Sequence, residues 1–150
     1  MNTAPLERPA KHSVLRSYAA TIEAEPDEVF AALAPIVEAT AGEGFFVTDP
    51  GTRRAIAQGG WWYRAEYRVL LDDAGSRIEH ELVNVAERFH WAGPIAGRAV
   101  VADSAAAFQR VLSQVVDALE AKTDQQNREV LLSRSALGRV VAVVLARSRR

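Results

Sequence analysis

His80 and Tyr67 are the residues of this 150-residue chain whose types and placement are best suited to chemistry. Two runs of alternating side chains, residues 61–71 and 76–87, flank the turn sequence at 72–75 and predict an antiparallel hairpin. Alternation places Tyr67 and His80 on the same apolar face. A histidine that titrates near neutral pH can act as a general base or orient a carbonyl group. Both residues are therefore candidates for proton transfer, although no second catalytic partner accompanies them. The alternative is a structural His80, hydrogen-bonded to Tyr67 or to a backbone carbonyl.

The same face carries further aromatic and polar residues that, with apolar residues of the predicted helices, would suit an internal binding cavity between sheet and helix. Aromatic rings with polar groups are typical of apolar ligand pockets, and an inward polar side chain needs a partner or a wet cavity. The predicted cavity residues are Phe30, Trp61, Tyr63, Tyr67, His80, Leu82, Asn84, Phe108 and Leu112. Plain core packing is the other interpretation of this set.

The opposite face of the predicted hairpin is charged. Its members are Arg64, Glu66, Arg68, Arg77, Glu79 and Glu81. Its glutamates could be a carboxylate pair for acid/base catalysis, but they alternate with arginines of opposite charge. Ion pairs across the two strands are therefore the favoured interpretation, on a face that water covers.

Several kinds of site are disfavoured by composition. The chain has no cysteine, which excludes disulfides, thiolate metal sites and cysteine nucleophiles. His12, His80 and His90 lack the i, i+4 spacing of a helical zinc pair, so no metal is expected. Pro94 removes a backbone donor that a phosphate-binding loop needs at residues 93–97. We expect no cofactor.

Charge is divided unevenly along the chain. Residues 1–127 hold 12 Lys and Arg against 18 Asp and Glu, a net charge of −6, whereas residues 128–150 hold six Arg and one Glu, a net charge of +5. An acidic body disfavours nucleic-acid binding, which depends on neutralising phosphates. The sequence therefore predicts no nucleic-acid partner for the main domain.

The elements that position these residues are predicted by changes in hydrophobic period. Alternation predicts strands, Pro26 and Pro35 delimit two short helices, and a long apolar stripe at spacings of three and four predicts a helix on the sheet. The predicted segments are an N-terminal flexible arm at 1–11, strands at 12–24, 45–49, 52–58, 61–71 and 76–87, short helices between Pro26 and Gly44, a long helix at 95–122 with Gly97 as an early weak point, and a linker at 124–127. This order predicts an α+β domain at 12–122, with a curved antiparallel sheet wrapped around a long C-terminal helix.

Three stretches of the sequence resemble one protein family. Residues 20–30, ATIEAEPDEVF, are similar to an opening strand that enters a first helix; residues 47–54, VTDPGTRR, are similar to a first hairpin; and residues 91–97, WAGPIAG, precede a long helix. Together they resemble the START-like, pollen-allergen-type helix-grip superfamily, also called SRPBCC or polyketide cyclase/dehydrase-like. The resemblance implies a small hydrophobic or aromatic ligand held between sheet and helix. It equally allows a cyclase or dehydratase that uses His80 and Tyr67. The family sheet has seven strands, whereas five are predicted here.

The segment after the long helix is basic and apolar. Its apolar run, residues 140–146, is seven residues long, against the roughly 20 that a membrane-spanning helix needs. Residues 128–150 are therefore expected to pack on the domain, on a second copy in a homodimer or on another protein, or to contact a membrane weakly. A module that recruits such a partner is a third functional alternative. Residues 1–13 lack the apolar run of a secretory signal, and a cytoplasmic location is expected.

Overall fold

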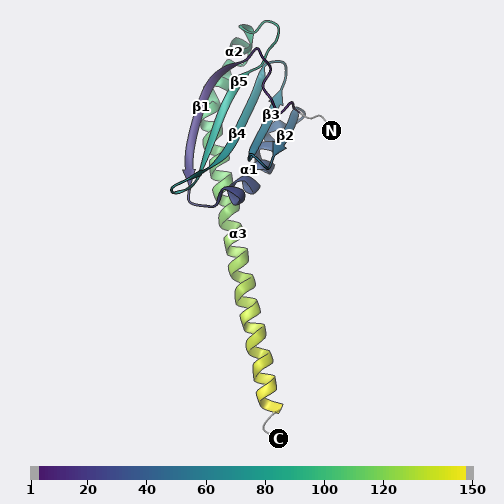
Figure 1. The fold of residues 1–150 in the computed structure, drawn as a ribbon, viewed down its shortest axis with the longest axis vertical. Helices are drawn as coiled ribbons and strands as arrows, with labels where there is room; N and C mark the ends of the chain where they lie inside the picture. The colour runs from purple at the N-terminus through teal and green to yellow at the C-terminus, as the bar shows by residue number, and fades with distance from the viewer. Residues whose placement is uncertain (1–3, 148–150) are drawn as a thin grey trace. The chain divides into compact units, whose positions relative to one another are not determined.

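Five strands form one antiparallel sheet in the order β1-β5-β4-β3-β2 (Figure 1). The computed structural model describes residues 4–147, with side chains for residues 4–132. The elements are β1 (Ser13–Ile22), α1 (Pro26–Ala41), β2 (Phe45–Asp49), β3 (Arg54–Gly59), β4 (Tyr63–Asp72), β5 (Gly75–Asn84), α2 (Ala92–Ala96) and α3 (Arg98–Arg147). The predicted α+β class with a long C-terminal helix is confirmed.

The sheet is a meander of β2 to β5, to which β1 adds an edge strand beside β5. β2, β3, β4 and β5 pair in sequence order, and β1 returns to pair with β5, so β1 and β2 are the two edges. The β4–β5 register places Tyr67 opposite His80, as alternation from the turn predicted. Side chains of alternate residues therefore form two faces, called here the inner face, which contains Tyr67 and His80, and the outer face, which contains Glu66 and Glu81.

A single helix, α1, replaces the two short helices that Pro35 was expected to separate. Pro26 begins the helix and Asp27 and Glu28 lie in its first turn, where acidic groups favour the helix dipole. Val29, Leu33 and Val37 are buried at spacings of four. Because this stripe continues past Pro35, whose ring is exposed, packing on the sheet maintains the helix through a residue that removes one backbone hydrogen bond.

Gly97 separates α2 from α3. A Cβ added at Gly97 would lie 1.8 Å from Cζ2 of Trp62, and one added at Gly93 would lie 2.9 Å from Cβ of Trp62. Only glycine permits this close approach of the chain to the buried indole. The expected weak point at Gly97 is thus a break between two helices.

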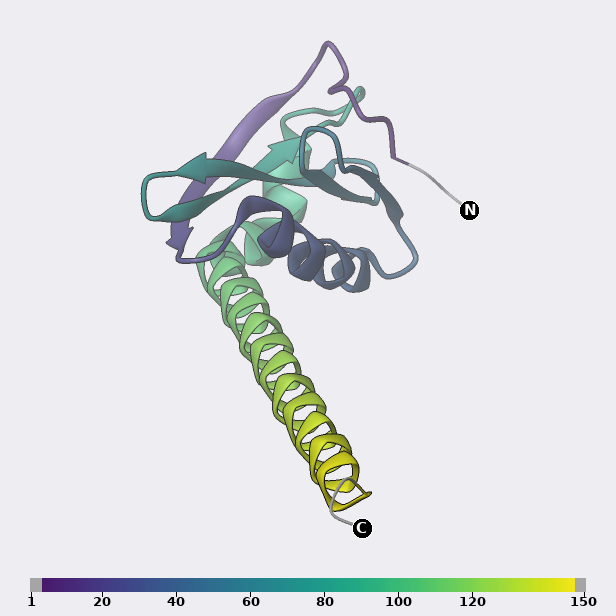
Figure 2. The same cartoon turned by 60° about the horizontal axis from the view of Figure 1, so that its bottom comes forward.

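The chain divides into two units, residues 1–116 and 117–150. In the first unit, Ser104, Phe108, Val111 and Val115 of α3 are buried, and Figure 2 shows α1 and the start of α3 on the same side of the sheet. In the second, residues 124–127, expected as a linker, are helical, and the side chains of residues 120–132 are exposed. The side chains of the apolar run at 140–146 lie outside the described residues. None of the helices in the described part of the chain has the length and apolar character needed to cross a bilayer.

Residues 4–11 contact the outer face of the sheet. Ala4 is buried, Arg8 donates to Glu66 and Glu81, and Arg64 donates to the carbonyl oxygens of Pro5 and Leu6. The expectation that nothing in the N-terminal arm would pack was therefore wrong. The outer face binds the Arg8 side chain and two backbone carbonyls of the arm, and side-chain patterns do not reveal the carbonyls.

Candidate functional site

The centre of the inner face is a stack of four aromatic rings from four elements. Tyr67 of β4 and His80 of β5 have ring centroids 4.2 Å apart and planes inclined by 15°. Phe108 of α3 lies 5.5 Å from His80, and Tyr18 of β1 lies 5.6 Å from Phe108. Stacked rings at these separations attract each other beyond the area that they bury. The stack connects the sheet to α3 within the first unit.

The tautomer of His80 follows from its hydrogen bond. Nδ1 lies 3.1 Å from the backbone oxygen of Glu66, and a carbonyl oxygen only accepts, so Nδ1 carries the proton. Nε2 is then the bare nitrogen of a neutral imidazole. Burial lowers the pKa of His80, more than the Glu66 carbonyl and the Glu81 carboxylate raise it. His80 is therefore a hydrogen-bond acceptor toward the inner face at neutral pH.

The hydroxyls of Tyr18 and Ser104 are both occupied by hydrogen bonds within the protein. The Ser104 hydroxyl donates to the carbonyl of Val101, so the Tyr18 hydroxyl, 2.8 Å away, donates to Ser104 Oγ. Neither residue was among the predicted site residues. Tyr18 lies in the strand predicted at 12–24, where apolar residues alternate, but its position beside His80 depends on the β1–β5 pairing, which the sequence does not specify.

Tyr63 and Tyr67 differ from Tyr18, because no residue in the described part of the chain hydrogen-bonds to either hydroxyl. Every fully buried side-chain nitrogen or oxygen in that part has a partner. The two hydroxyls, and likewise Nε2 of His80, must therefore reach solvent although their residues are mostly buried. Burial raises the pKa of both tyrosines, and for Tyr67 the neighbouring Tyr63 adds to the effect. Both are neutral donors across the physiological range.

The remaining predicted cavity residues lie in different surroundings. Phe30 is buried in α1, Leu82 in β5 and Phe108 in α3, and Leu112 is half-buried. Trp61 was wrongly placed on the inner face: it is 49% exposed, because β4 begins at Tyr63 and Trp61 belongs to the turn at Gly60.

Asn84 has a structural role at the end of β5. Its side chain donates to the carbonyl of His90 at 2.7 Å and accepts from the amide of Ala86 at 3.1 Å. Both polar atoms are occupied by the loop that leads to α2. Asn84 therefore fixes this loop and does not present a free polar group to a ligand.

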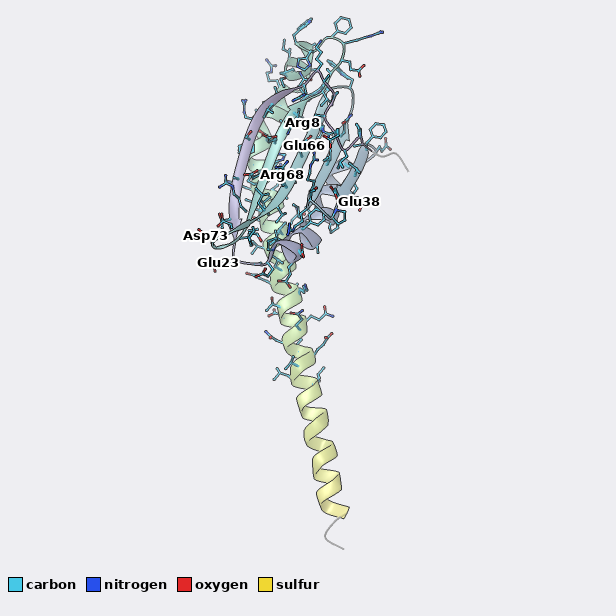
Figure 3. All side chains as sticks on the ribbon, viewed as in Figure 1. Arg8, Glu23, Glu38, Glu66, Arg68 and Asp73 are labelled. Atoms are coloured by element: carbon cyan, nitrogen blue, oxygen red, sulfur yellow. The ribbon has the colours of Figure 1, made fainter. Side chains whose placement is uncertain are left out.

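The outer face holds a charge network beneath the N-terminal arm (Figure 3). Arg64 is fully buried and donates to Glu66, Gln58 and the arm carbonyls, while Arg8 bridges Glu66 and Glu81, which lie directly opposite each other. The expected ion pairs between the two strands are thus replaced by a bridge from the arm. Burial alone would raise the pKa of Glu66, but Arg8 and Arg64 hold it below its ordinary value.

A hollow of about 130 Å³ lies on this outer face. It is lined by Arg8, Arg54, Glu66, Tyr67, Arg68, Glu79 and Glu81. Three arginines face three glutamates there, so their charges offset one another. No group of His, Asp or Glu suited to holding a metal ion occurs among the described residues.

Comparisons with known proteins identify no relative. No family model, no curated protein and no solved structure matches the chain.

Proposed function

We propose that this domain binds a small aromatic or hydrophobic ligand on the inner face of the sheet, between α1 and the first part of α3. The observation that carries the proposal is the set of three polar atoms described above: the hydroxyls of Tyr63 and Tyr67 and Nε2 of His80. Each lies on an apolar face, is reachable by solvent and lacks a protein partner among the described residues. Polar groups placed in this way fix the orientation of a ligand that apolar contacts bind.

The three atoms favour a particular ligand chemistry. The tyrosines are neutral donors and His80 Nε2 is an acceptor, so a ligand with a phenolic hydroxyl or a carbonyl group on an apolar ring system would satisfy them. A carboxylate ligand is disfavoured, because β4 and β5 carry no cation on the inner face and an unpaired buried charge is costly. Arg16 of β1 shares this face opposite Leu82, but it is exposed at the edge of the sheet. The proposed class is a neutral, hydroxylated aromatic compound.

Membership of the helix-grip superfamily is part of the same proposal. Its support is the resemblance of residues 20–30, 47–54 and 91–97, together with a five-stranded antiparallel sheet and a long C-terminal helix that are consistent with a helix-grip arrangement. A cytoplasmic location belongs to the proposal as well.

The experiment is a binding titration with 2-naphthol, compared with its methyl ether, on the full chain. Tyr67→Phe removes one open hydroxyl and keeps the ring, and it should weaken 2-naphthol binding by about threefold to tenfold, the effect of one net hydrogen bond. The matched control is Tyr18→Phe, since the Tyr18 hydroxyl is occupied by Ser104. Equal effects of the two variants, or a panel of hydroxylated aromatics that leaves the melting temperature of the protein unchanged, would contradict the proposal.

Catalysis is the second candidate, because His80 presents a bare, neutral Nε2 beside Tyr67. A cyclase or dehydratase that used His80 as its base would lose about 100-fold or more in turnover on His80→Ala, whereas a carrier would change only in affinity. Turnover of a bound polyketide-like aromatic substrate by the two proteins distinguishes these functions.

A further inference from the structure

Large exposed apolar side chains gather at one end of the sheet. This end, called here the apolar end, is where β3 and β5 finish, where β2 and β4 begin and where α2 lies (Figure 1). Its exposed members are Phe45 (38%), Trp61 (49%), Phe89 (70%), Trp91 (71%), Ile95 (64%) and Val100 (46%). They come from separate segments of the chain. An exposed apolar cluster of this kind on a folded domain is typical of a contact surface.

The loop between β5 and α2, which presents Phe89 and Trp91, is held firmly. Asn84 bonds to the His90 carbonyl and the Ala86 amide, and the His90 ring donates from Nδ1 to the carbonyl of Ala86 and accepts at Nε2 from Ser13. Within this loop Phe89 has a φ of 50°, a conformation that bulky side chains rarely adopt. Local strain that keeps an aromatic side chain in water indicates a function for its exposure.

Charge differs sharply between the two ends of the sheet. The apolar end carries the cations Lys11, Arg88 and Arg98, the last of them the first residue of α3, and the acids Glu43 and Glu87. The opposite end carries Glu23, Glu25, Asp27 and Glu28 before and in the first turn of α1, and Asp49, Asp72 and Asp73 at the β2–β3 and β4–β5 turns, against Arg53. Glu23 and Asp73 are labelled at that end in Figure 3. An anionic surface would therefore attract the apolar end and repel the other, which orients the domain.

We propose that the apolar end docks on a lipid bilayer that contains anionic lipids. Tryptophan and phenylalanine rings favour the headgroup level of a bilayer, and neighbouring arginines and lysines contact its negative surface. Aromatic insertion plus basic residues supplies the two signals that stable peripheral binding requires. This contact does not depend on the ligand proposed for the inner face, and it uses residues distinct from the basic segment at 128–150.

The test measures binding of the full chain to vesicles of phosphatidylcholine with and without 30% phosphatidylserine, a mixture chosen for about the charge of an anionic leaflet. The three tryptophans are residues 61, 62 and 91, and two of them are exposed at this end. Brominated lipids should therefore quench the intrinsic fluorescence. The double variant Phe89→Ser/Trp91→Ser should lower the partition coefficient about tenfold or more. Leu71→Ser is the matched control, since it removes an equally exposed apolar side chain (78%) at the acidic end and should leave binding unchanged.

A charge variant tests the same surface without touching any buried side chain. Arg88→Glu/Arg98→Glu should abolish the preference for phosphatidylserine, with an unchanged melting temperature. Three results would overturn the proposal: no binding of the wild type to phosphatidylserine vesicles, equal binding of the Phe89/Trp91 variant, which would assign the contact to another segment, or conversion of a dimer to a monomer by that variant without lipid, which would identify a second copy as the occupant.

Discussion

The two faces of one sheet satisfy their polar groups in opposite ways. On the outer face, Arg64 has no exposed surface, and its guanidinium is bonded to Glu66, Gln58 and two carbonyls of the N-terminal arm. On the inner face, the hydroxyls of Tyr63 and Tyr67 have no partner among the described residues. Both faces are built from β4 and β5, so neighbouring residues of the same strands serve opposite purposes.

Polar groups that stabilise the fold and polar groups that could bind a ligand have different requirements. A buried charge is stable only when all its donors are bonded, and the arm completes that set on the outer face. A ligand site instead needs polar groups that the protein leaves available and that are fixed by their surroundings. On the inner face, stacking with Phe108 fixes the rings of Tyr67 and His80. Charge on a face is thus a poor guide to open polar groups in this sheet, since the charged outer face is the one whose groups are bonded within the protein.

The largest effect is expected from Arg64→Met. The change removes a fully buried cation, leaves Gln58 Oε1 and the Pro5 carbonyl without their donor and takes one donor from Glu66 and from the Leu6 carbonyl, which keep Arg8 and Arg54. It should lower the free energy of unfolding by about 3–5 kcal/mol. Urea unfolding measures it. Arg77→Met is the control, since Arg77 pairs with Glu79 in a half-exposed position and should cost less than about 0.5 kcal/mol. Comparable costs would show that the arm does not complete the Arg64 site.

A second prediction uses pH to address each face separately. Because the folded-state pKa of His80 is depressed, the unfolded chain takes up a proton first, so stability is full above about pH 6.5 and falls as pH decreases below it. Glu66 has a depressed carboxyl pKa, and its contribution is lost only below about pH 4.5. His80→Gln should remove part of the slope below pH 6.5 and keep the slope below pH 4.5. Unfolding free energies of both proteins measured across this pH range test the prediction. An unchanged slope below pH 6.5 in the variant would contradict a buried neutral His80.

Much of the fold was predictable because its signals are local. Alternation and turn residues predicted all five strands to within a few residues, and the turn at 72–75 placed Tyr67 opposite His80. Errors occurred where tertiary contacts override local rules. Pro35 is kept within α1 by the buried stripe on either side, and Trp61 leaves the strand pattern because the turn at Gly60 extends through Trp62.

The candidate site was only partly predictable for the same reason. Tyr67 and His80 were expected on one apolar face with Phe108 on the helix beside them, and the hydrogen bond from His80 to a backbone carbonyl, part of the alternative interpretation, is present at Glu66. The bonding of Arg64 and Arg8 depends on backbone carbonyls and on the arm, over 50 residues away in sequence. No side-chain pattern encodes such a contact, so the completed outer face could be recognised only in three dimensions.

The smallest effect, and the most direct comparison of occupied with open polar groups, comes from two tyrosines of the inner face. Tyr18→Phe removes a hydroxyl that donates to Ser104 and should lower the unfolding free energy by about 1 kcal/mol. Tyr67→Phe removes a hydroxyl without a partner in the described part of the chain, and its cost should be within about 0.5 kcal/mol of zero, since water already solvates that group. Thermal and urea unfolding of both variants measure the difference. A Tyr67→Phe cost equal to that of Tyr18→Phe would mean that the Tyr67 hydroxyl is bonded within the protein, and the inner face would then resemble the outer one.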